Sequence, residues 1–300
     1  MIFPKKPQLL YAPMLATFGG GSVKGFTALG GDPTYYVNEF GSYYNNHNFK
    51  DMAIDSQDNV IVAGIVSNYS GGPSADYGWV AKFTKGGALE WYRDATKGAD
   101  LCEFHQVDTD INDNVFAGGR TRLSSVNNDN LLIKWNSSGV AQALKTFGSG
   151  SYGDEFIYGM VVDKRQYVQD KVYMASNVDT PYNQTAFHAM KNDLSAFQTF
   201  DYRMTSGVTN KASSPRAVTL NTNKGRLIIN GVDESYTGNA FSSLISMFTD
   251  NGNYSSRFVL RWQSGYNTFG FVARSESGSG ASVYFGGDAF TSSTGSWAGY

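Results

Sequence analysis

The sequence is poor in the features that define several protein classes. It has one cysteine, Cys102, among 300 residues, so no disulfide can form within the chain. Charged residues make up only 17% of the positions, and the formal net charge is −2. No apolar run approaches the ~18 residues of a membrane span. These shortages exclude a disulfide scaffold and argue against membrane insertion and against nucleic-acid binding through bulk positive charge.

Glycine and aromatic residues are abundant instead. The chain has 34 glycines, 19 tyrosines and 20 phenylalanines, whereas proline occurs at only 7 positions. So many aromatic side chains need burial, which argues against a disordered chain. Ala, Glu, Lys and Leu do not dominate, which argues against a coiled coil or a helical bundle. The composition therefore predicts an all-β protein of many short strands joined by turns.

The chain repeats itself about every 55 residues. Residues 51–64 read DMAIDSQDNVIVAG and residues 106–118 read QVDTDINDNVFAG, and three looser copies end at Ser176, Gly231 and Gly287. Each of the first four copies continues, after a polar connector, into a strand, a turn and another strand, as in GWVAKFTKGGALEWY at 78–92. The repeat unit therefore has four short strands.

Four strands in each repeat, without helical periodicity, predict a β-propeller of four-stranded blades. A single such sheet cannot bury both of its faces, and packing blades face to face around an axis buries them. The last copy lacks its fourth strand, and Thr34–Phe40 resembles the fourth-strand segment within 144–152. We therefore expect five blades, closed by the N-terminal strand. The alternative is that the chain is one end of a longer propeller.

The pattern V-x-D-x-x-D-N-V-x-V-A-G, followed by W-V-A-K-F-x-x-x-G, closely resembles the bacterial β-propeller repeat called SBBP. The match covers about residues 49–300 and is strongest in the first two repeats. It implies a propeller scaffold over residues 34–300 and no single activity. Residues 1–33 belong to no blade, and we interpret them as an extended docking arm with a hinge at Gly19–Gly25 (GGGSVKG).

The arm resembles the N-terminus of virion proteins of marine bacteriophages, which often begin with P-x-x-L-Y-A-P-M-L-x-T-F-G-G-G-S-x-R-G-F. Lys24 replaces the arginine of that string. The resemblance implies that the arm docks on other virion proteins, with several copies on a symmetric particle. The docking residues would be Leu9, Leu10, Tyr11, Met14, Leu15 and Phe18. The alternative for the arm is a solvated tail.

The resemblance implies that the protein is a structural or attachment component of a phage virion, with the propeller displayed outward on a tail, fibre or capsid appendage. The alternative is a secreted or surface bacterial propeller, located outside the cell, that binds carbohydrate or protein. A rim of four tyrosines in the polar connectors could bind a host-surface glycan, although for each of these residues we favour the alternative of an ordinary solvated loop. These residues are Tyr69, Tyr77, Tyr182 and Tyr236.

No residue pattern points to catalysis or to a cofactor. The histidines lie far apart without zinc-ligand spacing, and no His, Asp, Glu and Arg set repeats in the blades. We therefore expect a protein that is not an enzyme and that has no cofactor. A propeller hydrolase or lyase remains a third hypothesis, because propeller active sites draw residues from distant loops.

One acidic segment has the 1, 3, 5 spacing of a calcium loop: Asp108, Asp110 and Asn112. An EF-hand would need Gly at position 6 and Glu at position 12, where this chain has Asp113 and Gly119. We favour turn-forming roles for this cluster and for its equivalent around residues 55–59, in which Asx side chains bond nearby backbone N–H groups.

Overall fold

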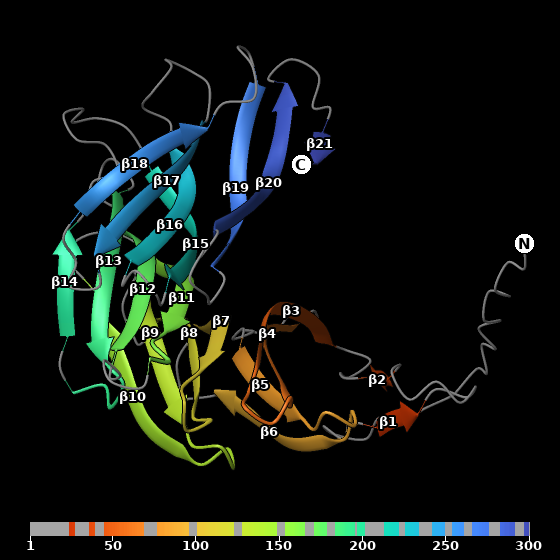
Figure 1. Ribbon diagram of the computed structural model, residues 1–300. Helices are drawn as coiled ribbons and strands as arrows, with labels where there is room; N and C mark the ends of the chain where they lie inside the picture. Colours follow the sequence, from red (N-terminus) through yellow and green to blue (C-terminus); the bar gives the residue numbers. More distant parts are fainter. Residues whose placement is uncertain are drawn as a thin grey trace, which may run out of the picture.

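The computed structural model describes seventeen ranges of the chain. They are residues 24–27, 36–39, 45–68, 77–95, 101–122, 128–148, 154–165, 171–178, 184–195, 197–201, 213–221, 226–233, 242–249, 254–260, 266–275, 283–291 and 297–299. Within these ranges the chain forms five antiparallel sheets in sequence order and one separate two-stranded sheet (Figure 1). The described residues contain no helix that is long and apolar enough to cross a membrane.

Four of the five sheets have four strands, paired in chain order. The first sheet contains β3 (Asn45–Ile54), β4 (Val60–Asn68), β5 (Tyr77–Phe83) and β6 (Leu89–Ala95). The second contains β7 (Leu101–Thr109), β8 (Val115–Arg122), β9 (Asp129–Trp135) and β10 (Ala141–Phe147). The third contains β11 (Glu155–Val162), β12 (Lys171–Val178), β13 (Gln184–Lys191) and β14 (Phe197–Asp201). The fourth contains β15 (Ser213–Asn221), β16 (Arg226–Asp233), β17 (Ser242–Thr249) and β18 (Tyr254–Leu260). The fifth has β19 (Tyr266–Ser275), β20 (Val283–Thr291) and β21 (Trp297–Gly299).

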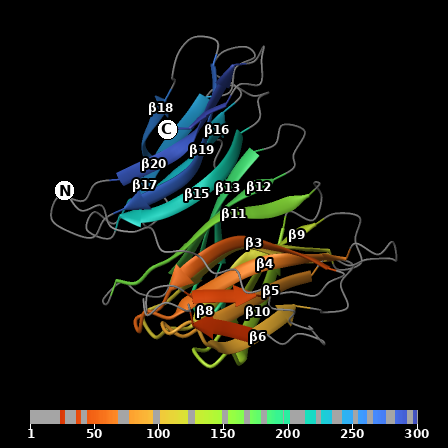
Figure 2. The same ribbon diagram turned by 90° about the vertical axis from the view of Figure 1, so that its right-hand side faces the viewer.

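The sheets follow one another as the blades of a propeller. The first strand of each sheet contacts the first strand of the next, from β3 through β7, β11 and β15 to β19. Figure 1 shows these strands toward the inside of the arc, while β6, β10, β14 and β18 lie toward its outside. Figure 2 shows the same sheets turned by 90°. The predicted fold, an all-β propeller of four-stranded blades, is confirmed.

The core lies between neighbouring blades. Strand β8 shows the arrangement: Val115 packs in the cluster shared with the first sheet, whereas Phe116 packs with Ile157 and Met160 of the third-sheet strand β11. Successive side chains of a strand point to opposite faces, so both faces of the second sheet are covered. This double burial explains the nearly continuous apolar runs of the second and third strands.

The turns between first and second strands are built by acidic side chains. Asp55 Oδ1 accepts hydrogen bonds from the backbone N–H groups of Gln57 and Asn59, each at 2.9 Å. The Asn59 side chain donates to Asp55 Oδ2, also at 2.9 Å. Asp110 makes the same three bonds in the second blade. These contacts are those of the Asx turns predicted from the sequence.

Several turn residues adopt the left-handed backbone conformation. Gly87 and Gly139 have φ values of 79° and 77° in the hairpins between third and fourth strands, as the glycines of these turns predict. Asp58 and Asp113 take φ values of 64° and 59° in the first turns. Asp tolerates this region better than most residues because its short side chain can bond locally.

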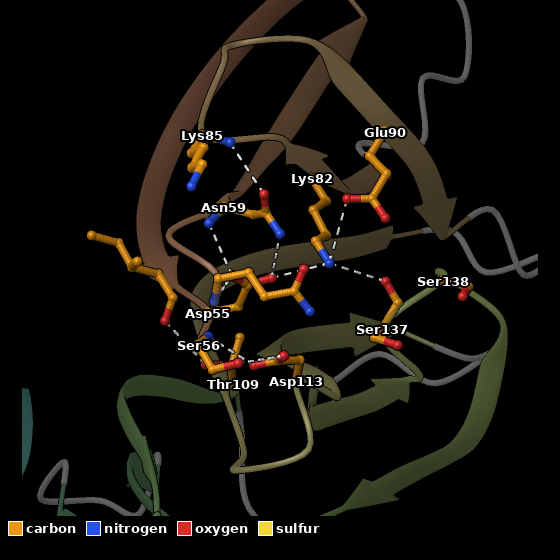
Figure 3. A network of polar contacts seen from close by, with 12 residues as sticks. Asp55, Ser56, Asn59, Lys82, Lys85, Glu90, Thr109, Asp113, Ser137 and Ser138 are labelled. Atoms are coloured by element: carbon orange, nitrogen blue, oxygen red, sulfur yellow. Dashed lines mark hydrogen bonds and ion pairs between the residues drawn. The ribbon is translucent and has the colours of Figure 1, made fainter. Parts of the chain in front are cut away.

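The same turns join the first blade to the second (Figure 3). Lys82 Nζ lies 3.0 Å from Asp55 Oδ2 and donates to the Ser137 carbonyl of the next blade at 3.3 Å. Ser56 donates through its N–H and its hydroxyl to the two oxygens of Asp113, each at 2.8 Å. The acidic turns therefore fix the spacing of the blades as well as the local backbone.

The N-terminal segment pairs differently from our expectation. β2 (Tyr36–Glu39) pairs with β1 (Lys24–Thr27), whereas the fifth sheet, in the part of the chain that the structure describes, consists of β19, β20 and β21. The expected completion of the last blade by residues 34–40 is therefore wrong. Closing a short hairpin costs less chain entropy than joining the two ends of the chain. The hairpin also spans the predicted boundary at residues 33 and 34, and its strand β1 contains the last two residues of the predicted hinge.

The other residues of the predicted arm, including its six docking residues, lie outside the described residues.

Candidate functional site

The first strand of every blade carries one β-bulge at an equivalent position. In each sheet the register between the first and second strands shifts by one residue. The bulged residues are Lys50, His105, Tyr158, Arg216 and Phe271. A bulge leaves its extra residue out of the ladder and re-aims that side chain, and bulges are frequent beside active sites. The fold therefore repeats one unpaired position around the inside of the arc.

The bulged His105 is held by a carboxylate. His105 Nε2 lies 3.0 Å from Glu103 Oε2. Arg120 donates to both oxygens of the same carboxylate, from Nε to Oε2 at 2.6 Å and from Nη2 to Oε1 at 3.0 Å. The Glu103 side chain is only 6% exposed, while that of His105 is 16% exposed. A buried, charge-assisted clamp thus orients a partly accessible imidazole.

The electrostatics of this group favour an ionised carboxylate beside a neutral imidazole. Burial raises the pKa of Glu103, but hydrogen bonds from His105 and Arg120 together with their charges lower it to about 2. Burial lowers the pKa of His105, and the positive charges of Lys50 and Arg120 add to this effect against the raising influence of Glu103. The ionised Glu103 accepts, so Nε2 of His105 carries the proton. Among the described residues, none supplies a hydrogen-bond partner to Nδ1.

Aromatic contacts join this group to the third blade. The ring of Phe156 on β11 packs edge-on against His105, with centroids 4.1 Å apart. The Phe156 ring also lies 4.2 Å from that of Tyr158, and the Arg120 guanidinium sits over it at 5.3 Å. Lys50 of β3 is exposed. Side chains of three blades therefore meet at one place, which we call the bulge cluster: Lys50, Glu103, His105, Arg120, Phe156 and Tyr158.

Sequence reasoning did not single out the bulge cluster. It noted only that the histidines lack metal-ligand spacing. Cys102, on the same strand as His105, packs in the core between the first two blades, where burial raises the pKa of its thiol to about 12. A usable signal was a small residue at the end of each repeat motif or, in the second blade, directly after it. In every blade a small residue, Gly119 in the second, pairs with the residue just before the bulge.

The predicted tyrosine rim remains a prediction. Tyr77 is the first residue of β5, and it packs against a cluster on the first sheet that contains Trp79 and Phe83. Tyr69, Tyr182 and Tyr236 lie outside the described residues.

The residues with calcium-loop spacing form contacts between blades and within their own turn. Asp108 Oδ1 lies 2.8 Å from Lys164 Nζ, and its Oδ2 accepts from the Val162 backbone N–H at 2.8 Å. Asp110 is occupied by its own turn, in which it accepts a bond from the Asn112 N–H. Within the described ranges, no group of three or more His, Cys, Asp or Glu side chains is arranged to hold a metal ion.

No protein-family model and no curated protein matches the sequence. Solved β-propeller structures match the fold. An α-L-arabinanase of Penicillium chrysogenum complexed with arabinobiose is 12% identical with a TM-score of 0.52, and the match covers 86% of each chain. A GH93 α-L-arabinofuranosidase of Fusarium graminearum is 10% identical with a TM-score of 0.53, over 86% of this chain and 82% of that one. The match to a GH74 enzyme of Niastella koreensis has a TM-score of 0.46, and this chain spans 38% of that protein.

These neighbours contradict the expectation that the protein is not an enzyme. That expectation relied on the lack of a repeating His, Asp, Glu and Arg set, whereas the neighbours are glycoside hydrolases built on the same fold. A catalytic propeller therefore does not need its functional residues to recur from blade to blade. At 10–12% identity the likeness establishes the fold, and an activity of this chain has to be argued from its own residues.

Proposed function

We propose that this protein is a glycan-recognising propeller that a bacteriophage particle carries on its surface. The observation that carries the glycan part is the bulge cluster. It combines an aromatic ring, Phe156, with the charged groups of Lys50, Glu103 and Arg120 and a partly accessible imidazole. Apolar surface with a few convergent polar groups is the usual composition of a small-molecule site. The carbohydrate-active neighbours support this proposal at the level of the fold.

The virion part is supported by the N-terminal string and its likeness to marine phage proteins. In this proposal the arm docks on other virion proteins, and the propeller faces the host surface in several copies. The competing proposal is a bacterial propeller located outside the cell without a particle. Both proposals share the glycan site, so two separate experiments are needed.

Glycan recognition is tested by titrating the full chain with host-surface polysaccharide. We expect Phe156→Ala to weaken binding about tenfold or more, because one lost aromatic contact at a binding site commonly costs over 1 kcal/mol. Ile111→Ala is the matched control: this residue is apolar and 38% exposed, and it lies in the turn beyond the other end of β7. Equal binding by wild-type protein and the Phe156 variant would remove the cluster from the proposal.

The tether is tested by deleting residues 1–23, which leaves β1 and its partner β2 in place. We expect the shortened protein to fold but to be missing from purified particles. Substituting Leu9 and Leu15 by Asp in the full chain should have the same effect. Undiminished incorporation of both variants would favour the free extracellular propeller.

A further inference from the structure

We propose that His105 is the general base of a β-elimination that cleaves a uronate-containing polysaccharide. This inference rests on the proposed glycan recognition at the bulge cluster and assigns to it a substrate class and a reaction. The reaction breaks the bond between C4 of a uronate and its glycosidic oxygen, without water as a reactant.

The geometry that supports a base is the hydrogen-bonded series Arg120, Glu103, His105. Arg120 fixes both oxygens of the Glu103 carboxylate, and this carboxylate accepts the Nε2 proton of His105. The lone pair of Nδ1 is then the basic site of the imidazole, and no described residue occupies it. A carboxylate that fixes the tautomer and orientation of a histidine is a recurrent device of proton transfer. Glu103 and Arg120 are positioning residues in this scheme.

Glu103 and Asp51 do not supply the pair of carboxyl groups that glycoside hydrolysis uses. That pair needs one protonated carboxylic acid and one ionised carboxylate on either side of the scissile bond. Glu103 cannot supply the acid at neutral pH, since its pKa is about 2 and both oxygens are already bonded. Asp51 has a pKa raised by burial to about 6, but its two oxygens accept the backbone N–H groups of Met52 and Val107. A histidine base therefore fits this site better than a carboxylate pair.

The elimination balances with the groups present. Nδ1 of His105 takes the proton from C5, which is acidified by the adjacent carboxylate of the uronate. The electron pair of the C5–H bond forms a C4=C5 double bond, and the C4–O bond breaks with its electron pair on oxygen. That oxygen then takes a proton from the hydroxyl group of Tyr158, which is the hydroxyl-bearing residue of the cluster. The positive charge of Lys50 favours the anionic substrate and the charge that develops on its carboxylate.

The electrostatic surroundings of His105 set the expected pH dependence. The charged groups that act on it are Glu103 on its own strand, Lys50 on β3 and Arg120 on β8. Asp154 and Tyr158 of the third blade act in turn on Arg120. The base must be neutral, and the pKa of His105 is lowered below its ordinary 6.5. The elimination rate should therefore rise with pH below 6.5 and level off before neutrality.

The test uses the full chain with polygalacturonate and alginate as acidic probes and arabinan as a neutral one. The product of elimination absorbs ultraviolet light because its new double bond is conjugated with the carboxylate. We expect absorbance to grow with an acidic probe that the protein binds, and His105→Ala to slow this growth about 10²–10⁴-fold. Lys145→Gln, on the outer strand β10, is the matched control and should leave the rate unchanged.

Glu103→Gln separates positioning from a general loss of structure. Because the Glu103 carboxylate raises the pKa of His105, its neutral replacement should lower the rate and move the pH profile toward acid. A rate that falls equally at every pH would contradict the positioning role. New reducing ends without absorbance, or a bound acidic probe that stays intact, would overturn the elimination and leave glycan recognition standing. Failure to bind any host glycan would overturn the proposed function itself.

Discussion

Asp55→Asn is the most informative perturbation of the scaffold. It keeps the size of the side chain but removes the charge that faces Lys82, and the side chains of Lys82 and Asp55 are only 4% and 1% exposed. Breaking a buried pair by removing one partner costs about 3–5 kcal/mol, because the other charge stays buried. In the variant, Lys82 Nζ would still have two partners: the Ser137 carbonyl at 3.3 Å and the carboxylate of Glu90 at 3.4 Å, whose side chain is 40% exposed. We therefore expect a loss of about 3 kcal/mol in the free energy of unfolding, at the low end of this range.

Urea denaturation followed by circular dichroism measures this loss, and a double-mutant cycle isolates the pair. Lys82→Met combined with Asp55→Asn should be more stable than Asp55→Asn alone by at least about 1 kcal/mol, because no charge is then left unpaired. A loss below about 1 kcal/mol for Asp55→Asn, as for an exposed pair, would refute the reasoning.

The pH dependence of this pair has a definite sign. Burial raises the pKa of Asp55, but the hydrogen bonds of Asn59, the backbone and Lys82 lower it below 3.8 overall. A lowered pKa in the folded state stabilises the protein above the unfolded value and loses that effect as the pH falls. The stability difference between wild-type protein and Asp55→Asn should therefore shrink as the pH falls below about 4.

Two further predictions concern stability. Gly119→Ala should cost about 1–3 kcal/mol, because its Cβ would overlap the Glu103 carbonyl oxygen, whereas Gly86→Ala should stay within about 0.5 kcal/mol because its nearest neighbour is 3.6 Å away. Thermal unfolding compares the two, and equal effects would contradict the packing. Burial lowers the pKa of His188 from 6.5 to about 3. Between pH 6.5 and about 3, His188 is therefore protonated in the unfolded chain but neutral in the folded chain. Stability should fall by up to about 5 kcal/mol on acidification through this window, and urea midpoints at pH about 4 and about 7 should differ less in His188→Gln. An unchanged pH dependence in this variant would contradict the assignment.

The repeat made the blade architecture predictable because its determinants are local. Asp55 and Asp110 bond backbone groups two and four residues further along the chain, so their spacing is visible in the sequence. Gly87 and Gly139 likewise mark hairpins between neighbouring strands. The four-strand unit follows from signals that lie within one repeat.

The bulge cluster and the N-terminal pairing depend on which strands pair and in which register, and the sequence does not specify these partners. A bulge is a property of two strands in register, and it leaves no mark on the bulged residue itself. The sequence signal lies in the neighbouring second strand. An added Cβ at Gly64 would overlap the carbonyl oxygen of Asn48 in the first strand, and one at Gly119 would overlap that of Glu103. Gly64 ends its repeat motif and Gly119 directly follows the motif of the second blade, so a small residue at this position is a signature of close backbone approach beside the bulge.

The nitrogen chemical shifts of His105 test the account most directly. The chain has three histidines, so ring-nitrogen spectra of labelled protein distinguish them with one substitution each. We predict a neutral His105 ring at neutral pH with its proton on Nε2, and a shift of its Nδ1 signal when a polygalacturonate oligosaccharide is added, while His188 stays unchanged. A proton on Nδ1, or an oligosaccharide that binds without moving the His105 signals, would contradict a glycan site at the bulge cluster.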